Sequence, residues 1–468
     1  MLANIKRFAL PILIICFFGL VAALSPLKGL LISRNTDDKT TTFIRAILGD
    51  KVKPKTTLLL FANNNALRVG GGFVGTIGVL RGDGDNIAIR EIRSVYYYDH
   101  RLDDKVGFVV APNYMGRFTD SLRIADSLSE PITSLNLQRA HDVYSRVSGE
   151  KIDNVVEITP DLLKSILDIT GPIELREYNL TVDSTNVLKT IQLEVESGKD
   201  RVIGKDPKSV LSVLANEIIQ RIPQLSLRDT GRYYSLLGRV SAGEQARALL
   251  NISDPSRLVV TNSREEYIGA KNALLITSSN LDAGKASMSI KQNISLDYYI
   301  GSDGKDRYSL DITRTHTASE KLSYVDPRTG GGNDIIGTDI SAIQVYLPLG
   351  ARPVDDNEAP IVLESTNRWV KYTEEMQLGL QETKNISFTY TLQRREEISG
   401  RISGSQWVLY QFGASPQRVK VRIHAPAGYV VADLPSNATT VDNRIIQFDI
   451  FQEQQDLELK YDFRSEAE

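Results

Sequence analysis

The pattern of hydrophobic and polar positions divides the chain into two parts. From Thr56 to about Ile252, short apolar runs of strand length alternate with segments in which apolar residues recur every three or four positions, as a helix requires. After Arg257 the helical period disappears, and alternating apolar and polar positions are interrupted by turn residues. The pattern therefore predicts an α/β (α+β) domain followed by one or two all-β, sandwich-like modules.

The first part contains two kinds of predicted element. Strands are predicted at residues 58–61, 73–80, 87–98, 106–110, 155–158 and 173–175. Helices are predicted at residues 135–148, 160–170, 206–222 and 241–250. Thr159 is expected to cap the second helix and Gly171 to end it, which places this helix between two strands in a βαβ-like unit. The last helix is expected to open with a capping box formed by Ser241 and Glu244.

The second part is predicted to consist of strands. They lie at residues 273–277, 286–300, 308–317, 342–347, 361–364 and 386–392, followed by a smaller set at 406–412, 418–424, 445–451 and 457–463. The smaller set forms either a last β-domain or the rest of the same sandwich. The expected organisation is an anchor at 1–32, a stalk at 33–55, an α/β domain at 56–256, a β-sandwich-like domain at 257–398 and a C-terminal β module at 399–468.

The N-terminal segment predicts a membrane anchor. Residues 8–24 form a run without charge that is long enough to cross a bilayer, and Lys6 and Arg7 precede it. The basic pair should stay cytoplasmic, which makes the chain a single-pass protein of the cell membrane with everything that follows outside. A cleaved signal peptide is the alternative, although the run exceeds the usual apolar core of such peptides. The polar stalk that follows contains one amphipathic helix, predicted at 41–48.

Composition limits the classes of function. The 468 residues are 41% hydrophobic and 24% charged, which is typical of a globular protein with two to four domains. The net charge of −3 argues against general nucleic-acid binding, which needs a basic surface. The single cysteine, Cys16, lies in the predicted membrane helix. The exported part therefore has no disulfide, thiol nucleophile or cysteine metal site.

The stretch that joins the first two predicted strands is the leading candidate for a site. It contains three consecutive asparagines, one arginine and three consecutive glycines: Asn63, Asn64, Asn65, Arg68, Gly70, Gly71 and Gly72. Asn and Gly tolerate positive φ, so these residues are expected to form a tight loop whose backbone N–H groups cradle an anion. Arg68 would bind phosphate or carboxylate through two-point contact. The alternative is an ordinary turn with a solvated arginine.

Arginines and aspartates follow this loop at short intervals. They are Asp99, Arg101, Arg117, Asp120, Arg123 and Asp126. Together with Arg68 they suit a pyrophosphate held by guanidinium groups and a divalent metal, such as Mg²⁺, held by carboxylate oxygens. The alternative is a set of exposed ion pairs, which contribute little. No HExxH, GxSxG or GxxxxGK[ST] motif occurs, so the usual signatures of zinc proteases, α/β-hydrolases and P-loop proteins are missing.

The same stretch carries a family resemblance. Its sequence NNNALRVGGGFVGTIGVL resembles the opening motif of the domain-of-unknown-function 4012 family, Q-N-N-x-E-L-R-P-T-G-G-F. The positions that fit are Asn63, Asn64, Leu67, Arg68, Gly71, Gly72 and Phe73, whereas Ala62, Ala66, Val69 and Gly70 depart from the motif. The resemblance continues at residues 123–126, 155–175 and 278–287 and implies architecture and location more than chemistry.

A more distant resemblance concerns the LytR-CpsA-Psr phosphotransferases. The order of a strand, a turn, a strand ending in Asp99 to Arg101, the segment at Arg123 and the elements of residues 155–175 is similar to that family. Its members hold a polyprenyl pyrophosphate with arginines and aspartates and pass a cell-wall glycopolymer to an acceptor. Asp99 and Arg101 map onto the family's S-x-P-R-D motif in reversed order. The resemblance therefore implies a fold more than an activity.

Two hypotheses of function follow. In the first, the chain is a membrane-anchored, extracytoplasmic enzyme of envelope polymers that binds a lipid-linked pyrophosphate with Arg68, Asp99, Arg101 and Arg123. In the second, it is a non-catalytic surface protein whose β-domains bind a partner or a glycan. Convergence of the four residues on one cleft would favour the first hypothesis. Scatter would favour the second.

Overall fold

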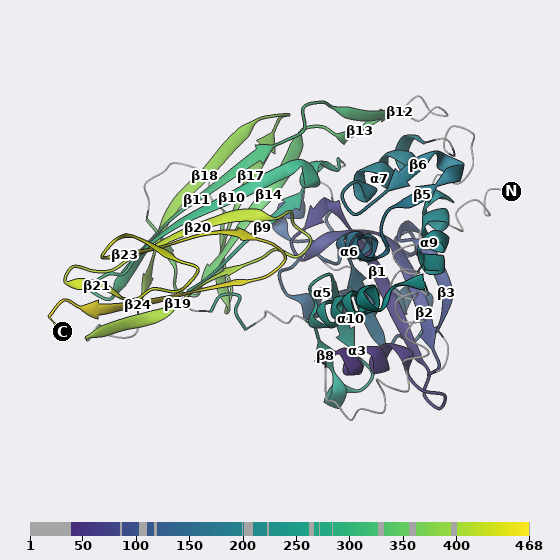
Figure 1. Ribbon diagram of the computed structural model, residues 1–468, viewed down its shortest axis with the longest axis horizontal. Coiled ribbons are helices and arrows are strands. Elements are labelled where there is room, and N and C mark those ends of the chain that lie inside the picture. The colour runs from purple at the N-terminus through teal and green to yellow at the C-terminus, as the bar shows by residue number, and fades with distance from the viewer. Residues whose placement is uncertain are drawn as a thin grey trace. The chain divides into compact units, whose positions relative to one another are not determined.

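The computed structural model describes most of the chain after residue 38. The described residues are 39–84, 87–102, 110–116, 119–198, 200, 209–221, 224–261, 266–270, 272–282, 284–325, 332–354, 362–394 and 400–467. They form two compact units (Figure 1). The α/β unit contains the described residues within 1–64, 70–263 and 324–332, and the β unit contains those within 65–69, 264–323 and 333–468.

The predicted membrane span at residues 8–24 lies outside the described residues. Among the residues that the structure describes, no helix is long and apolar enough to cross a membrane.

A six-stranded sheet, in the order β3-β2-β1-β4-β7-β8, forms the centre of the α/β unit. Its strands are β1 (Lys55–Arg68), β2 (Gly71–Gly82), β3 (Ile87–Ser94), β4 (Asn154–Ile158), β7 (Ala246–Leu250) and β8 (Val259–Val260). The central pair β1 and β4 is parallel, with Leu58 opposite Val155, whereas β4–β7 and β7–β8 are antiparallel. A separate two-stranded sheet joins β5 (Ile173–Leu175) to β6 (Leu180–Val182).

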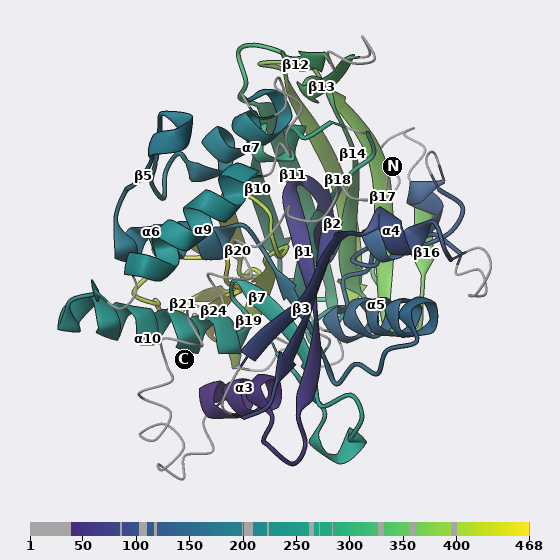
Figure 2. The ribbon, with the colours of Figure 1, turned by 90° about the vertical axis from the view of Figure 1, so that its right-hand side faces the viewer.

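Helices cover both faces of the six-stranded sheet (Figure 2). They are α3 (Lys39–Leu48), α4 (Tyr96–Asp99), α5 (Thr133–Ser148), α6 (Asp161–Thr170), α7 (Val187–Ser197), α9 (Ser209–Arg221) and α10 (Leu227–Ala242), with short 3₁₀ turns η2 (Asn113–Met115), η3 (Ile124–Asp126) and η4 (Arg176–Tyr178). Leu59 and Phe61 of β1 share a core with α3, α6 and α10, whereas Leu58 and Leu60 share a core with α5. Burial on both faces explains the uninterrupted apolar run of this strand.

Helix α3 is part of the α/β core, although its segment was expected to be a polar stalk. It begins at Lys39, close to the helix predicted at 41–48. Its Phe43 and Ile47 are buried in the same apolar cluster as Leu163 of α6. The amphipathic period correctly predicted the helix, and the apolar face that it buries makes it part of the folded domain.

The helix predicted at 241–250 is wrong. Ser241 lies near the end of α10, where its hydroxyl donates to the Gly238 carbonyl oxygen (2.8 Å), and no helix opens there. Residues 246–250 form β7 instead, and all five are buried. A strand covered on both faces lacks the alternation that identifies strands, so the sequence ARALL resembles a helical pattern.

The surroundings of α6 differ in part from the prediction. The helix begins at Asp161, and the Thr159 hydroxyl donates to the Gln245 carbonyl oxygen (3.1 Å) rather than capping it. Gly171 ends the helix with a φ of 77°, as predicted. The βαβ-like unit is wrong, because β5 after the helix pairs only with β6, in the separate sheet.

The β unit consists of two seven-stranded sheets. One has the order β15-β18-β11-β10-β20-β23-β22 and the other β16-β17-β14-β9-β19-β24-β21. The strands are β9 (Ala273–Asn280), β10 (Ile290–Tyr299), β11 (Lys305–His316), β14 (Asp339–Pro348), β15 (Arg352–Pro353), β16 (Val362–Ser365), β17 (Trp369–Leu378), β18 (Thr383–Gln393), β19 (Arg401–Leu409), β20 (Gln417–His424), β21 (Tyr429–Asp433), β22 (Thr439–Asp442), β23 (Ile445–Gln452) and β24 (Leu457–Ser465). A two-stranded sheet of β12 (Leu322–Val325) and β13 (Gly332–Ile336) is separate.

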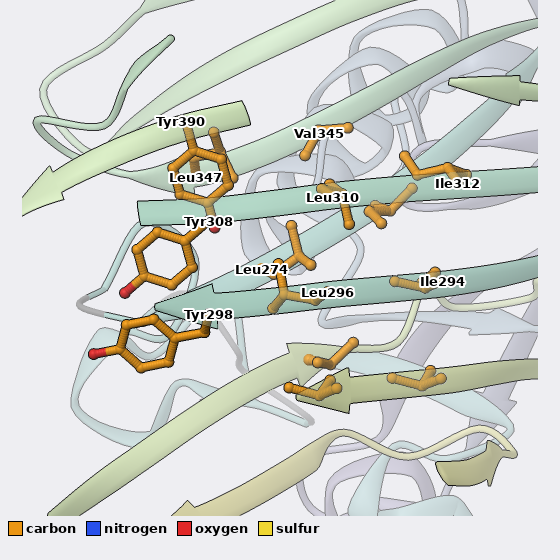
Figure 3. Packing of buried hydrophobic residues seen from close by; sticks show 14 of the residues in the cluster. Leu274, Ile294, Leu296, Tyr298, Tyr308, Leu310, Ile312, Val345, Leu347 and Tyr390 are labelled. Carbon is orange, nitrogen blue, oxygen red and sulfur yellow. The ribbon is translucent and has the colours of Figure 1, made fainter. Parts of the chain in front are cut away.

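Buried residues of both seven-stranded sheets form one hydrophobic core. Three neighbouring strands contribute the stacked rings of Tyr298, Tyr308 and Tyr390, with successive centroids 4.5 and 4.6 Å apart (Figure 3). Strands β19 and β20 pair in parallel with β9 and β10, so residues 400–467 share the sheets of the earlier strands. The strands from β9 onwards, apart from the separate pair β12 and β13, thus form a single sandwich.

Candidate functional site

The asparagine and glycine stretch is a hairpin rather than an open loop. Strand β1 extends to Arg68 and β2 begins at Gly71, so only Val69 and Gly70 remain as the turn. The backbone polar groups of paired strands are largely used by the sheet. The expected loop with N–H groups open to an anion is therefore wrong.

Asn64 is 2% exposed, and its side chain makes a hydrogen bond inside the α/β unit. Its Nδ2 donates to Asp161 Oδ2 (3.1 Å), and Asp161 Oδ1 accepts from Lys164 Nζ (2.8 Å) at the start of α6. These residues lie at the carboxyl ends of the parallel strands β1 and β4, where open α/β sheets commonly bind ligands. Asn64 is too buried here to offer a surface, and the neighbouring Asn63 is half-buried.

The glycines of the hairpin are required by close packing. A Cβ atom on Gly71 would lie 2.0 Å from Glu157 Oε1, and one on Gly72 would lie 2.5 Å from the Asn63 backbone. Both distances are shorter than any ordinary contact, so a side chain at either position would force its neighbour to move. This packing explains the two glycines without a bound anion.

Glu157 and Arg247 form a buried pair beside this turn. They face each other across β4 and β7, and Arg247 Nη1 donates to the Gly70 carbonyl oxygen (3.1 Å). Burial raises the pKa of Glu157 to about 8, and the charge of Arg247 opposes the rise. Arg247 thus ties the turn to β7, and the pairing was not found from the sequence, in which the two residues are 90 positions apart.

Arg68 belongs to the β unit and is 5% exposed. Its Nη1 donates to the carbonyl oxygens of Asn280 (3.1 Å) and Leu67 (3.2 Å). Gln411 Nε2 donates to the carbonyl oxygens of Arg68 (2.9 Å) and Ser278 (2.8 Å). The guanidinium expected to bind phosphate therefore bonds to the chain's own carbonyl groups. These contacts lie within the β unit, to which residues 65–69 belong.

Asp99, Arg123 and Asp126 come together around η3. Asp99 is 1% exposed, and its two carboxylate oxygens accept the backbone N–H groups of Ile124 (2.9 Å) and Ala125 (3.3 Å). Arg123 Nη1 donates to the Asp99 carbonyl oxygen (2.7 Å), and Asp126 is buried in the same turn. Burial raises the pKa of Asp99 to about 6, although the N–H bonds lower it. The three residues build this turn rather than line an open site.

Arg101 is exposed and lies against an aromatic ring. The strand predicted at 87–98 ends at Ser94, and the helix α4 that follows presents Tyr97. The Cζ atoms of Arg101 and Arg93 lie 3.5 and 4.2 Å from the Tyr97 ring centroid, and Arg101 Nη1 donates to the Tyr97 carbonyl oxygen (3.1 Å). Such cation–π contacts stabilise an exposed aromatic side chain.

The predicted residues are held mainly by contacts within their own unit, and the hairpin turn meets the segment after η3, where Gly70 N–H donates to the Leu128 carbonyl oxygen (2.9 Å). Asn64 and Gly71 lie at the hairpin and Asp99, Arg101 and Arg123 around α4 and η3, whereas Arg68 belongs to the other unit. Asp120 is exposed, and Arg117 lies outside the described residues. Within the described ranges, no group of three or more His, Cys, Asp or Glu side chains could hold a metal ion.

A hollow in the α/β unit provides a different candidate site. Its volume is about 1400 Å³, and it lies at the end of the sheet where β1 and β4 begin. Seven basic side chains line it: Arg45, Lys51, Lys53, Lys55, Arg81, Lys151 and Arg257. Three acidic side chains line it as well: Asp50, Asp153 and Asp254. The difference of four positive charges, seven minus three, makes this basic hollow attractive to an anion.

The acidic side chains of the basic hollow bond locally and shape its walls. Asp50 Oδ1 accepts the backbone N–H groups of Val52 (2.8 Å) and Lys53 (2.6 Å), which fixes the turn between α3 and β1. Asp153 Oδ1 lies 3.3 Å from Lys55 Nζ. The cations of the turn are thereby held at the rim. The carboxylates keep their negative charge, which the larger number of lining cations outweighs.

Asp254 bonds to neighbouring residues in the connection after β7. Its carboxylate lies 3.7 Å from Arg257 Nε, and the Ser256 hydroxyl, which donates to Oδ1, holds the pKa of Asp254 below its usual value. The side chains of Arg81, Lys151 and Arg257 are exposed. Exposed cations are accessible to a charged ligand, and salt screens their attraction.

Sequence reasoning missed the basic hollow because its residues come from separate segments. They lie on α3, on the α3–β1 turn, on β2 and on the connections before β4 and after β7. The run KVKPK at residues 51–55 is the local feature that could have indicated a basic site, and it is equally typical of a solvated turn. The parallel pairing of β1 with β4 is what brings these segments to one end of the sheet.

Comparison with protein families identifies one match. Residues 53–195 match the model of a family described as a protein of unknown function, DUF4012. This match covers the first strands of the six-stranded sheet and the elements up to α7. A comparison with curated proteins gives no match.

Several solved structures are similar to parts of the chain. A putative nutrient binding protein from Legionella pneumophila is 11% identical over 42% of this chain and 70% of its own, with a TM-score of 0.26. TagV from B. subtilis is 13% identical over 42% of this chain and 74% of its own, with a TM-score of 0.26. An M1 zinc metallopeptidase from Deinococcus radiodurans is 16% identical over 38% of this chain and 42% of its own, with a TM-score of 0.19. These scores carry no argument about function.

Proposed function

We propose that this chain, whose residues 53–195 match the family of unknown function DUF4012, is a membrane-anchored, extracytoplasmic protein of the bacterial envelope that binds a phosphate-bearing ligand without transferring it. The basic hollow carries the proposal, because seven basic and three acidic side chains line a volume of about 1400 Å³. A pyrophosphate group concentrates negative charge on several acceptor oxygens, which lysine and arginine recognise. The lipid-linked pyrophosphate of a glycopolymer precursor is the ligand of this chemistry that we infer.

Binding without transfer is supported by the contacts of two residues that were expected to bind pyrophosphate, Asp99 and Arg68. Both carboxylate oxygens of Asp99 accept backbone N–H groups, and the Arg68 guanidinium donates to backbone carbonyl oxygens. Phosphoryl-type transfer depends on groups that stabilise charge developing on the ligand. Residues already used by their own backbone are poorly placed for that task.

The location follows from the N-terminal sequence. The uncharged run at residues 8–24 after Lys6 and Arg7 suits a single span with the later residues outside. A ligand built on a membrane lipid would then be within reach of the described units. This location is part of the proposal, and it can be tested by adding protease to intact spheroplasts, where the α/β and β units should be digested.

Binding of inorganic pyrophosphate should depend on Arg81. Arg81→Glu replaces an exposed cation of the basic hollow with an anion, so it removes one attraction and adds one repulsion. Exposed charge pairs contribute about 0.2–1 kcal/mol each, so the variant should bind roughly 2- to 30-fold more weakly. The measurement is isothermal titration calorimetry of the full chain in a neutral detergent at low salt.

Arg101→Glu is the matched control, since Arg101 is an exposed arginine of the same unit outside the basic hollow. Its affinity for pyrophosphate should equal that of the wild type. Equal weakening by both variants would mean that only net charge matters. Absence of pyrophosphate binding by the wild type would remove the proposed ligand.

A further inference from the structure

The rim of the basic hollow combines cations with exposed apolar side chains. Val52 is 86% exposed and lies between Lys51 and Lys53, two lining residues. Leu258 is 46% exposed and follows Arg257, another lining residue. A single exposed apolar side chain is ordinary on a soluble surface. Val52 and Leu258 are each adjacent in sequence to cations of this rim, and basic and apolar side chains together are what segments at a membrane surface use.

The turn that carries Val52 is fixed rather than loose. The backbone N–H groups of Val52 and Lys53 both donate to Asp50 Oδ1, and Asp50 N–H donates to the Lys53 carbonyl oxygen (3.3 Å). Gly49 at the end of α3 adopts a φ of 62°, a left-handed conformation that glycine adopts without steric cost. The turn therefore holds the Val52 side chain in solvent by its own hydrogen bonds.

Chain length limits how far this rim can lie from the predicted span. Helix α3 begins at Lys39, and residues 25–38, fourteen in number, separate it from the end of the predicted span. A chain of that length reaches at most about 50 Å when fully extended. Thr42 and Arg45 of α3 line the basic hollow, so one of its walls lies within a few residues of this tether.

We propose that the rim of the basic hollow rests on the anionic surface of the bilayer that anchors the chain. Lys51, Lys53 and Arg257 contact lipid phosphates, and Val52 and Leu258 enter the boundary between headgroups and acyl chains. The inference rests on the proposed function, because it assumes an anchored chain. The proposed partner of this surface is the anionic phospholipid of the same membrane. In this position the basic hollow would face ligands that are carried by lipids.

Charge and apolar contact should contribute to membrane binding in different ways. Attraction of lysine and arginine to an anionic leaflet falls off within a Debye length, about 10 Å at 0.1 M salt, so these cations act only at the surface itself. Burial of apolar side chains in the interface does not depend on salt in this way. Contact should therefore require anionic lipid and weaken as salt increases.

The test places an environment-sensitive fluorophore at residue 52. The full chain carries Cys16→Ser, which removes its only cysteine, and Val52→Cys, and it is inserted into nanodiscs of phosphatidylcholine with or without phosphatidylglycerol. We expect a blue-shifted emission, quenched by lipids labelled near the headgroup, only in the anionic discs. Adding Lys51→Glu and Lys53→Glu should abolish the shift.

Leu227→Cys is the matched control, because Leu227 is an apolar residue of the same unit with 94% exposure that does not line the basic hollow. It lies at the start of α10, fourteen residues before Ser241, whose hydroxyl lies 3.0 Å from that of Thr40 in α3. A helical segment of that length spans about 21 Å, so this probe should keep its aqueous emission in both kinds of disc.

The outcomes separate the inference from the proposed function. A probe at residue 52 that behaves like the one at residue 227 overturns the membrane contact, even when calorimetry shows bound pyrophosphate. A blue shift at residue 52 without pyrophosphate binding supports the membrane contact and removes the proposed ligand. A chain that does not enter the discs overturns the anchor and, with it, the inference.

Discussion

Replacing Arg68 with alanine is expected to destabilise the protein and to leave its affinity for pyrophosphate unchanged. The Arg68 guanidinium is buried and donates to the carbonyl oxygens of Asn280 and Leu67. Hydrogen bonds that involve a charged group contribute about 1.5–3 kcal/mol, and a buried acceptor left alone is costly. We expect a loss of about 2–5 kcal/mol in the free energy of unfolding, measured by urea denaturation.

Two further variants serve as controls for the loss of stability in Arg68→Ala. Arg68→Lys should recover part of the stability, because an ammonium can reach one carbonyl but cannot reproduce the planar set of donors. Arg101→Ala removes an exposed arginine that stacks on the Tyr97 ring and donates to the Tyr97 carbonyl oxygen, and it should cost less than about 1 kcal/mol. A stable Arg68→Ala protein that no longer binds pyrophosphate would restore Arg68 as a ligand-binding residue.

Gly71→Ala should be among the most damaging single substitutions in the α/β unit. Its new Cβ atom would lie 2.0 Å from Glu157 Oε1 and 3.3 Å from Leu128 Cδ1. Glu157 is buried beside Arg247, so its carboxylate cannot move aside into solvent. Overpacking of this kind costs about 1–3 kcal/mol and lowers the melting temperature. Differential scanning calorimetry provides the measurement.

Gly75→Ala is the matched control on the same strand. A Cβ atom at Gly75 would meet only the Phe73 ring, 3.8 Å away, which is ordinary contact. Its melting temperature should stay close to the wild-type value, or rise slightly because alanine restricts the unfolded chain. If both alanine variants melt alike, the close approach of Glu157 to Gly71 does not constrain the hairpin.

The sandwich could be predicted because its strands keep one face in the core. In β11, Tyr308, Leu310 and Ile312 are buried and the residues between them are more exposed, which produces the period of two that the sequence shows. Strand β7 could not be predicted this way, since its five residues are all buried. Helices α5 and α9 of the α/β part could be predicted, because apolar residues recur in them with the period of a helix, which can be recognised in the sequence alone.

The hairpin illustrates why polar residues mislead local reasoning. Consecutive asparagines and glycines are typical of turns, yet Asn64 is inside a strand because Asp161, 97 positions later, bonds to its amide. Arg68 looks like a solvated or ligand-binding cation until its carbonyl partner, Asn280, is known. Long-range hydrogen bonds of this kind override local propensity and leave no trace in a short stretch of sequence.

The basic hollow could not be predicted for a related reason. Arg81, Lys151 and Arg257 each look like a solvated cation, and only strand pairing brings them to one end of the sheet. A net charge of −3 for the whole chain hides a local excess of positive charge. The composition gives only the net charge of the whole chain, so it could not indicate this local surface.

Lysine footprinting by mass spectrometry tests most directly whether the basic hollow holds a phosphate-bearing ligand. The full chain is acetylated briefly with and without saturating inorganic pyrophosphate, and each lysine's rate is compared. The account predicts slower acetylation of Lys51, Lys53, Lys55 and Lys151, which line the basic hollow, and an unchanged rate at the exposed Lys305 of the β unit. Unchanged rates at the four lining lysines, with pyrophosphate demonstrably bound, would contradict it.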